Sequence, residues 1–274
     1  MLEQNLLFGS KDGGKTWPDF ASLTPSEARD ALAMLARLRP VLPRRRTRRW
    51  IAGRRRGRRP ARARMLRAAL RTAGEPLLWR WLAHPKRPRP IALVCDISGS
   101  MERYSRLMLR FAHALGRSGA QVEVFVFGTR LTRITRELRV RDPDAALARV
   151  GRLVDDWNGG TRIGDSLRQL NRQWVRRTIR SGAVLLIASD GWERGDPAVL
   201  AEEMARLRRS CYRLYWLDPL AGQAGFEPAV AGLKAALPYL DALVPGASVA
   251  SLEQLAGTLA GVTGRFRPIQ RKIG

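Results

Sequence analysis

Five oxygen-bearing side chains, in three separate stretches of the sequence, could together hold a divalent metal ion. Asp96, Ser98 and Ser100 form an Asp-x-Ser-x-Ser motif directly after the apolar run 91–95. Carboxylate and hydroxyl oxygens are hard donors, which suit Mg²⁺ or Mn²⁺. Gly99 between the two serines lets the backbone turn tightly. This motif therefore supplies one carboxylate and two hydroxyls for a candidate site.

Two further segments supply the remaining donors. Thr161 follows Asn158-Gly159-Gly160 ahead of a helical pattern, and Asp190 follows the apolar run 185–188 and Ser189. Each segment taken alone has an ordinary explanation as a turn or a helix cap. Taken together and in this order, they predict a metal site of two carboxylates and three hydroxyls. Such a site leaves a coordination position that a partner's Glu or Asp can fill.

From residue 91 onward, short apolar runs alternate with amphipathic helical patterns. This alternation predicts an α/β fold with a mainly parallel, doubly wound sheet and helices on both faces. Open sheets of this class place their ligand sites at the carboxyl ends of the strands, where the three donor segments fall. The predicted strands are 91–95, 121–127, 183–189 and 212–217, with 131–135 as an antiparallel edge. The predicted helices are 101–117, 143–154, 163–176, 197–208 and one that begins near Ser251.

The remainder of the chain divides by composition. A capping pattern at Thr24-Pro25-Ser26-Glu27 predicts a helix over 24–39, and the prolines at 85, 88 and 90 mark a boundary. We therefore predict four regions. They are an N-terminal helical extension (1–43), an Arg-rich segment with a Pro-rich linker (44–90), the metal-binding domain (91–264) and a basic C-terminal tail (265–274).

The charge predicts acidic partners. Lys and Arg number 50 against 24 Asp and Glu, which leaves a formal net charge of +26, and much of the excess lies between Arg37 and Arg71. Such a cluster fits an acidic protein surface or the phosphates of a nucleic acid. Nucleic-acid binding is the main alternative function, although Trp50 is the only aromatic residue within this segment for base stacking before Trp79 and Trp81. Both kinds of partner stay open for residues 37–71.

Catalytic and membrane functions find little support in the residues. Gly9 to Thr16 satisfy the P-loop expression, but Pro18 falls where the following helix needs its amide. The two histidines, His84 and His113, have no evident nucleophile partner. The first residues lack the pattern of a signal peptide, and no apolar stretch is long enough to span a membrane. We therefore expect a cytoplasmic binding module rather than an enzyme.

Several stretches resemble the von Willebrand factor A (VWA) domain family, and within it the CoxE-like branch. They are 109–115, 124–132, 157–164 and 189–196, and the similarity runs from about Arg44 to Val262. The resemblance implies a Rossmann-like VWA fold with a metal-ion-dependent adhesion site (MIDAS). It also implies a MoxR-type AAA+ ATPase as partner, with the pair maturing or remodelling a client metalloenzyme such as carbon monoxide dehydrogenase. The metal ligands it implies are Asp96, Ser98, Ser100, Thr161 and Asp190.

Overall fold

The protein is described by a computed structural model, which places seven parts of the chain. These are residues 33, 44–72, 79–117, 121–154, 160–179, 182–223 and 225–259. Of the helix predicted over 24–39, only Ala33 is among them, in helical conformation. The P-loop-like stretch and the basic tail lie outside the described residues. The described residues divide into two compact units, one within Pro43–Pro88 and the other formed by the described residues from Arg89 onward.

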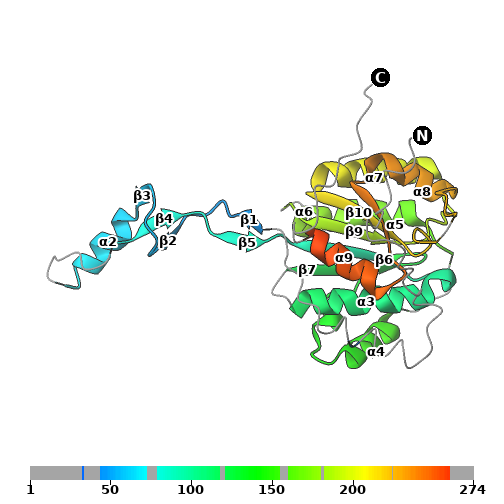
Figure 1. The fold of residues 1–274 in the computed structure, drawn as a ribbon, viewed down its shortest axis with the longest axis horizontal. Helices are drawn as coiled ribbons and strands as arrows, with labels where there is room; N and C mark the ends of the chain where they lie inside the picture. The colour runs from blue at the N-terminus through cyan, green and yellow to red at the C-terminus, as the bar shows by residue number, and fades with distance from the viewer. Residues whose placement is uncertain are drawn as a thin grey trace, which may run out of the picture. The chain divides into compact units, whose positions relative to one another are not determined.

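The larger unit is built on a six-stranded sheet with the order β11-β10-β9-β6-β7-β8 (Figure 1). All neighbouring strands are parallel except β7 and β8, which are antiparallel. This arrangement confirms the predicted fold class, including the antiparallel edge at residue 131. The strands are β6 (Ile91–Asp96), β7 (Val122–Phe127), β8 (Leu131–Arg133), β9 (Val184–Ala188), β10 (Arg213–Asp218) and β11 (Ala242–Pro245).

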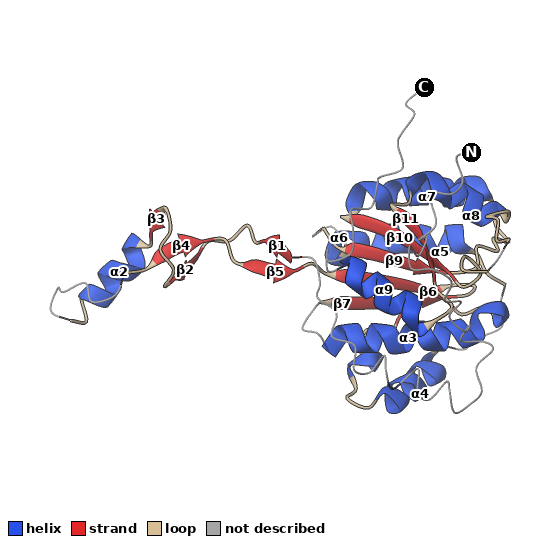
Figure 2. Cartoon of the chain, in the orientation of Figure 1, coloured by secondary structure: helices blue, strands red, loops and turns tan. Residues whose placement is uncertain are grey.

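Helices cover both faces of this sheet (Figure 2). One hydrophobic core joins the sheet to α3, α4 and α9, and a second core joins it to α5, α6, α7 and α8. The helices are α3 (Glu102–Arg117), α4 (Pro143–Leu153), α5 (Ile163–Gln173), α6 (Val175–Thr178), α7 (Pro197–Ser210), α8 (Ala231–Ala236) and α9 (Val249–Leu259). Three short 3-10 turns, η2 (Gly99–Met101), η3 (Glu137–Arg139) and η4 (Leu237–Tyr239), complete the unit's described helical elements.

The central strands read as continuous apolar runs because helices cover them on both sides. Every residue of β6 and of β9 is buried. Parallel strands in this position show no alternation of polar and apolar residues, since neither face meets water. This is why the two strands that precede the candidate metal ligands were readable from the sequence.

Strand β11 and helix α8 of the larger unit fall outside every predicted element. Strand β11 has four residues and ends in Pro245, and helix α8 has six residues without a side-chain cap. A proline is tolerated at the end of β11 because this strand pairs only with β10 and forms the edge of the sheet. Elements this short give too weak a periodic pattern to be recognised.

The smaller unit, Pro43–Pro88, consists of short antiparallel strands and one helix. A two-stranded sheet pairs β1 with β5, and a three-stranded sheet has the order β2-β4-β3. The elements are β1 (Arg44–Arg46), β2 (Ile51–Gly53), β3 (Arg59–Pro60), α2 (Arg62–Ala69), β4 (Trp81–Ala83) and β5 (Lys86–Pro88). The Arg-rich segment and the tryptophans that follow it therefore belong to one folded unit.

None of the helices in the described ranges combines the length and the apolar character needed to cross a lipid bilayer.

Candidate metal centre

The loops that follow β6 and β9 bring donors from two of the three predicted segments together. The Ser100 hydroxyl donates a hydrogen bond to Oδ2 of Asp190 at 2.6 Å, across 90 residues of sequence. The Ser98 and Ser100 hydroxyl oxygens lie 3.3 Å apart. Because β6 and β9 are adjacent parallel strands, their carboxyl ends open into the same region. With Asp96 at the end of β6, four of the five predicted donors form one cluster.

Asp96 is oriented by two hydrogen bonds at the end of its strand. Its Oδ1 accepts from the backbone N–H of Ser98 at 2.9 Å, and its Oδ2 accepts from the Ser189 hydroxyl at 2.8 Å. Burial raises the pKa of Asp96 to about 6, the hydrogen bonds from Ser98 and Ser189 oppose that rise, and the charge of Asp190 adds to it. The carboxylates of Asp96 and Asp190 thus lie in a poorly hydrated environment where they repel each other. A cation bound between them would relieve that repulsion.

Thr161, the fifth predicted donor, connects to the cluster through its backbone. The residue is buried, and its carbonyl oxygen accepts from the N–H of Arg194 at 3.1 Å. This bond ties the start of α5 to the loop that carries Asp190. Among the described residues, its hydroxyl has no hydrogen bond with the other four donors. The preceding Asn158 and Gly159 lie outside the described part of the chain.

Glu193 joins the same two segments, and the sequence reasoning did not single it out. Its carboxylate accepts from the backbone N–H of Gly164 at 2.7 Å and from that of Gly195 at 2.6 Å. Gly164 lies in the first turn of α5, whose N-cap residue Arg162 makes no side-chain cap. Glu193 therefore caps α5 from another loop and holds Thr161 beside the Asp190 loop. Burial raises the pKa of Glu193, and these two hydrogen bonds oppose the rise.

Ser189 is the second residue that the sequence reasoning did not assign. Besides its bond to Asp96, its Oγ accepts from the N–H of Gly191 at 3.0 Å, and its carbonyl oxygen accepts from Nε1 of Trp216 at 2.9 Å. Ser189 thereby links the buried carboxylate, the loop and the core. In the sequence, the one feature that pointed to Ser189 was its position between an apolar strand and Asp190.

Asp218 places a third carboxylate at the same edge of the sheet, at the end of β10. Its Oδ1 accepts from the N–H of Leu220 at 2.7 Å, while its buried Oδ2 has no hydrogen-bond partner. Burial raises the pKa of Asp218 to about 6, and the charge of Asp190 adds to the rise. Across the described ranges, no three carboxylate, imidazole or thiol groups gather as a metal site. A metal at this edge would therefore depend on the hydroxyls as well.

A close backbone approach fixes the loop after Asp190. Gly191 has φ +79°, and a Cβ built on Gly232 at the start of α8 would overlap with the carbonyl oxygen of Gly191. A side chain at either position would push the loop away from α8 or strain its backbone.

We expect Gly232→Ala to lower the free energy of unfolding by about 1–3 kcal/mol, because the added methyl group overpacks this contact. Urea denaturation measures the change. Gly151→Ala is the matched control, since Gly151 lies in α4 and a Cβ there meets nothing within 4 Å. The free energy of unfolding of this control should rise by about 0.5–1 kcal/mol, because alanine has a better helix propensity than glycine. Equal effects of the two substitutions would contradict the close approach.

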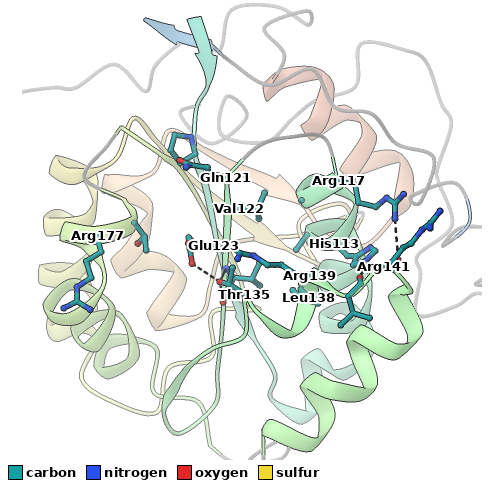
Figure 3. A pocket seen from close by; sticks show the side chains of 16 residues that line it. His113, Arg117, Gln121, Val122, Glu123, Thr135, Leu138, Arg139, Arg141 and Arg177 are labelled. Carbon is teal, nitrogen blue, oxygen red and sulfur yellow. Dashed lines mark hydrogen bonds between the residues drawn. The ribbon is translucent and has the colours of Figure 1, made fainter. Parts of the chain in front are cut away.

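A cavity of about 530 Å³ lies at the other end of the sheet, near the start of β7. Figure 3 shows Arg177 on the opposite side of the cavity from Arg117 and Arg141, and Arg117 donates to the carbonyl oxygen of Arg141 at 3.5 Å. Glu123 in its lining already accepts from Thr135 at 2.8 Å and pairs with Arg133 at 2.7 Å. The carboxylate in this lining is therefore already paired, and the cluster around Asp96 is the better candidate site.

The family comparison matches residues 34–252 to the model for "VWA domain containing CoxE-like protein". No curated protein matches the chain. Among solved structures, a von Willebrand factor type A protein from Catenulispora acidiphila has a TM-score of 0.48 at 19% identity, covering 66% of this chain and 44% of its own. Proximal thread matrix protein 1 from the mussel byssus has a TM-score of 0.45 at 16% identity, covering 64% and 47%.

The same mussel protein, in a structure described as having a zinc-occupied MIDAS motif, has a TM-score of 0.41 at 14% identity. That match covers 64% of this chain and 47% of the mussel protein. This chain thus spans less than half the length of these structural relatives.

Proposed function

Because this chain belongs to the family of VWA domain-containing CoxE-like proteins, we propose that it is a metal-dependent protein interaction module. In this proposal it is a cytoplasmic adaptor of a MoxR-type AAA+ ATPase and acts in the maturation or remodelling of a client metalloenzyme. Carbon monoxide dehydrogenase is an example of such a client. The module binds and positions its partners and carries out no covalent chemistry.

The observation that carries the proposal is the hydrogen bond from the Ser100 hydroxyl to Asp190 at 2.6 Å. It joins two loops 90 residues apart, and this close pairing of a hydroxyl with a carboxylate supports the proposal that one ion contacts both. Together with buried Asp96, the cluster combines carboxylate and hydroxyl oxygens, a donor set that suits Mg²⁺ or Mn²⁺.

The residues that would hold the ion are Asp96, Ser98, Ser100, Thr161 and Asp190. When bound, the ion supplies a positive centre that attracts a carboxylate of the partner. The two carboxylates among these ligands balance the charge of a divalent ion without exceeding it, so the ion itself would still attract an incoming Glu or Asp, while Asp218 at the same edge opposes that attraction. Ser189 and Glu193 contribute by orienting Asp96 and by holding the Thr161 segment near the Asp190 loop.

We expect Mg²⁺ or Mn²⁺ to raise the affinity of the chain for its MoxR-type ATPase, and Asp96→Ala or Thr161→Ala to abolish that gain. Surface-immobilised ATPase, titrated with the chain in metal and then in chelator, measures the difference. Glu202→Gln on α7 is the control, because this exposed carboxylate pairs with Arg206 away from the cluster. Equal affinity in metal and in chelator would contradict the proposal.

A further inference from the structure

The unit Pro43–Pro88 carries most of the excess charge of the chain. It contains 17 Lys and Arg residues and a single acidic residue, Glu75, so it holds +16 of the net +26. Glu75 lies outside the described residues, so the described part of this unit has no carboxylate with which an arginine could pair internally. The described residues of this unit therefore leave its charge unbalanced by carboxylates, and an acidic partner would be attracted to it.

The same unit also exposes large apolar side chains. Of nine such side chains in the described residues, five lie here. They are Trp50, Ile51, Leu66, Leu70 and Trp79. Scattered single exposures are normal on a protein surface, but this concentration in one small, highly charged unit indicates an interaction surface.

Helix α2 arranges the two kinds of side chain on one face. Leu66 in α2 and Leu70, the C-cap residue directly after it in helical conformation, are 64% and 74% exposed and lie four residues apart, one above the other. Exposed Arg62 continues this row, and Arg67 and Arg71 stand beside it. The inward side of α2 carries Ala69, which is buried. The outward face is thus a leucine row flanked by guanidinium groups, which we call the leucine–arginine face.

We propose that this leucine–arginine face binds an acidic amphipathic helix of a protein partner. Carboxylates of such a helix would pair with the arginines, and its apolar stripe would cover Leu66 and Leu70. A helix that packs along an exposed apolar row is a common mode of peptide recognition. The inference is independent of the metal site, because none of the five proposed ligands lies in this unit.

Binding of a nucleic acid would explain the exposed arginines of this face, but it would not explain the exposed leucines. Trp79 is 63% exposed and stacks on Trp81 with ring centroids 6.3 Å apart, so base stacking is available. A phosphate backbone would nevertheless leave Leu66 and Leu70 in water. Burying two leucine side chains stabilises a complex, and the apolar stripe of a protein helix offers a surface that can bury them.

Fluorescence anisotropy with the full chain in chelator tests the proposal. The probes are a labelled helical peptide with Leu and Glu in a heptad repeat, the same peptide with Gln for Glu, and a single-stranded RNA oligonucleotide. We expect the acidic peptide to bind and the Gln peptide to bind far more weakly. The double substitution Leu66→Gln with Leu70→Gln should lower the affinity for the acidic peptide on the order of tenfold or more. It should leave the affinity for RNA unchanged.

Leu153→Gln on α4 is the matched control, because it replaces an exposed leucine, 43% accessible, in the other unit. It should leave binding of the acidic peptide unchanged. The leucine variant keeps the full charge, and circular dichroism checks its folding. Absence of peptide binding, or equal peptide affinity of the leucine variant and the wild type, would overturn the proposal. Tight RNA binding that displaces the peptide would identify the face as a nucleic-acid surface instead.

Discussion

Asp96→Asn is expected to remove the stabilisation that a divalent metal gives to this protein. At a metal concentration 100 times the Kd, a ligand that binds only the folded state stabilises it by about 2.7 kcal/mol. Loss of one of two carboxylates should weaken metal affinity on the order of 100-fold or more, as even indirect partners of metal ligands contribute 10- to 100-fold. At the same metal concentration, the metal then raises the free energy of unfolding of the variant by only about 0.4 kcal/mol. Urea denaturation with and without Mn²⁺ measures both values.

The asparagine is chosen because it can keep the local hydrogen bonds. Its Oδ1 still accepts from the N–H of Ser98, and its amide can donate to the Ser189 hydroxyl in place of the present bond. The metal-free variant should therefore fold. Glu202→Gln, which neutralises an exposed carboxylate on α7, should keep the full metal effect. If Mn²⁺ raised the free energy of unfolding of Asp96→Asn as much as that of the wild type, Asp96 would be ruled out as a ligand.

Trp216→Ala is expected to destabilise the fold by about 3–5 kcal/mol, the cost of a large cavity in a packed core. Trp216 lies in β10, is 0% exposed and belongs to the core beneath α5 to α8. Its indole Nε1 also donates to the carbonyl oxygen of Ser189 at 2.9 Å, so the substitution frees the loop that orients Asp96. Urea denaturation monitored by circular dichroism gives the free energy of unfolding.

Trp192→Ala provides the comparison for this core substitution. Trp192 is 65% exposed, and its backbone N–H, which the substitution retains, donates to Asp190. Removing the exposed ring should change the free energy of unfolding by no more than about 0.5 kcal/mol. A Trp216→Ala variant that is as stable as Trp192→Ala would show that the indole does not support the core.

The candidate site was partly readable because its donors follow recognisable strands. Asp96, Ser98 and Ser100 stand directly after an apolar run, and Asp190 stands two residues after another. Ser189 and Glu193 were not readable as partners, because their roles depend on acceptors and donors far away in the sequence. Glu193 caps α5 through Gly164, 29 residues away, and no local pattern encodes such a contact.

In the Arg-rich region, the sequence revealed the charge, while the structure was needed to reveal the strands. Its charge was evident from composition, but its short strands were not, since runs of arginine do not carry the alternation of polar and apolar residues that marks a strand. The antiparallel pairing of β4 with β2 and β3 places Trp81 and Trp79 in the same unit as the arginines. This pairing brings the aromatics into the unit that carries the leucine row and the charge.

The sequence by itself determined the α/β class, the order of the central strands and helices, and the types of donor near residues 96, 161 and 190. These follow from local periodicity and from the burial that each run of residues demands. The tertiary structure decided which donors meet, which neighbours orient them and how the basic unit folds. The physical reason is that strand adjacency and loop-to-helix hydrogen bonds join residues that are distant along the chain, and nothing in the residues between them records the contact.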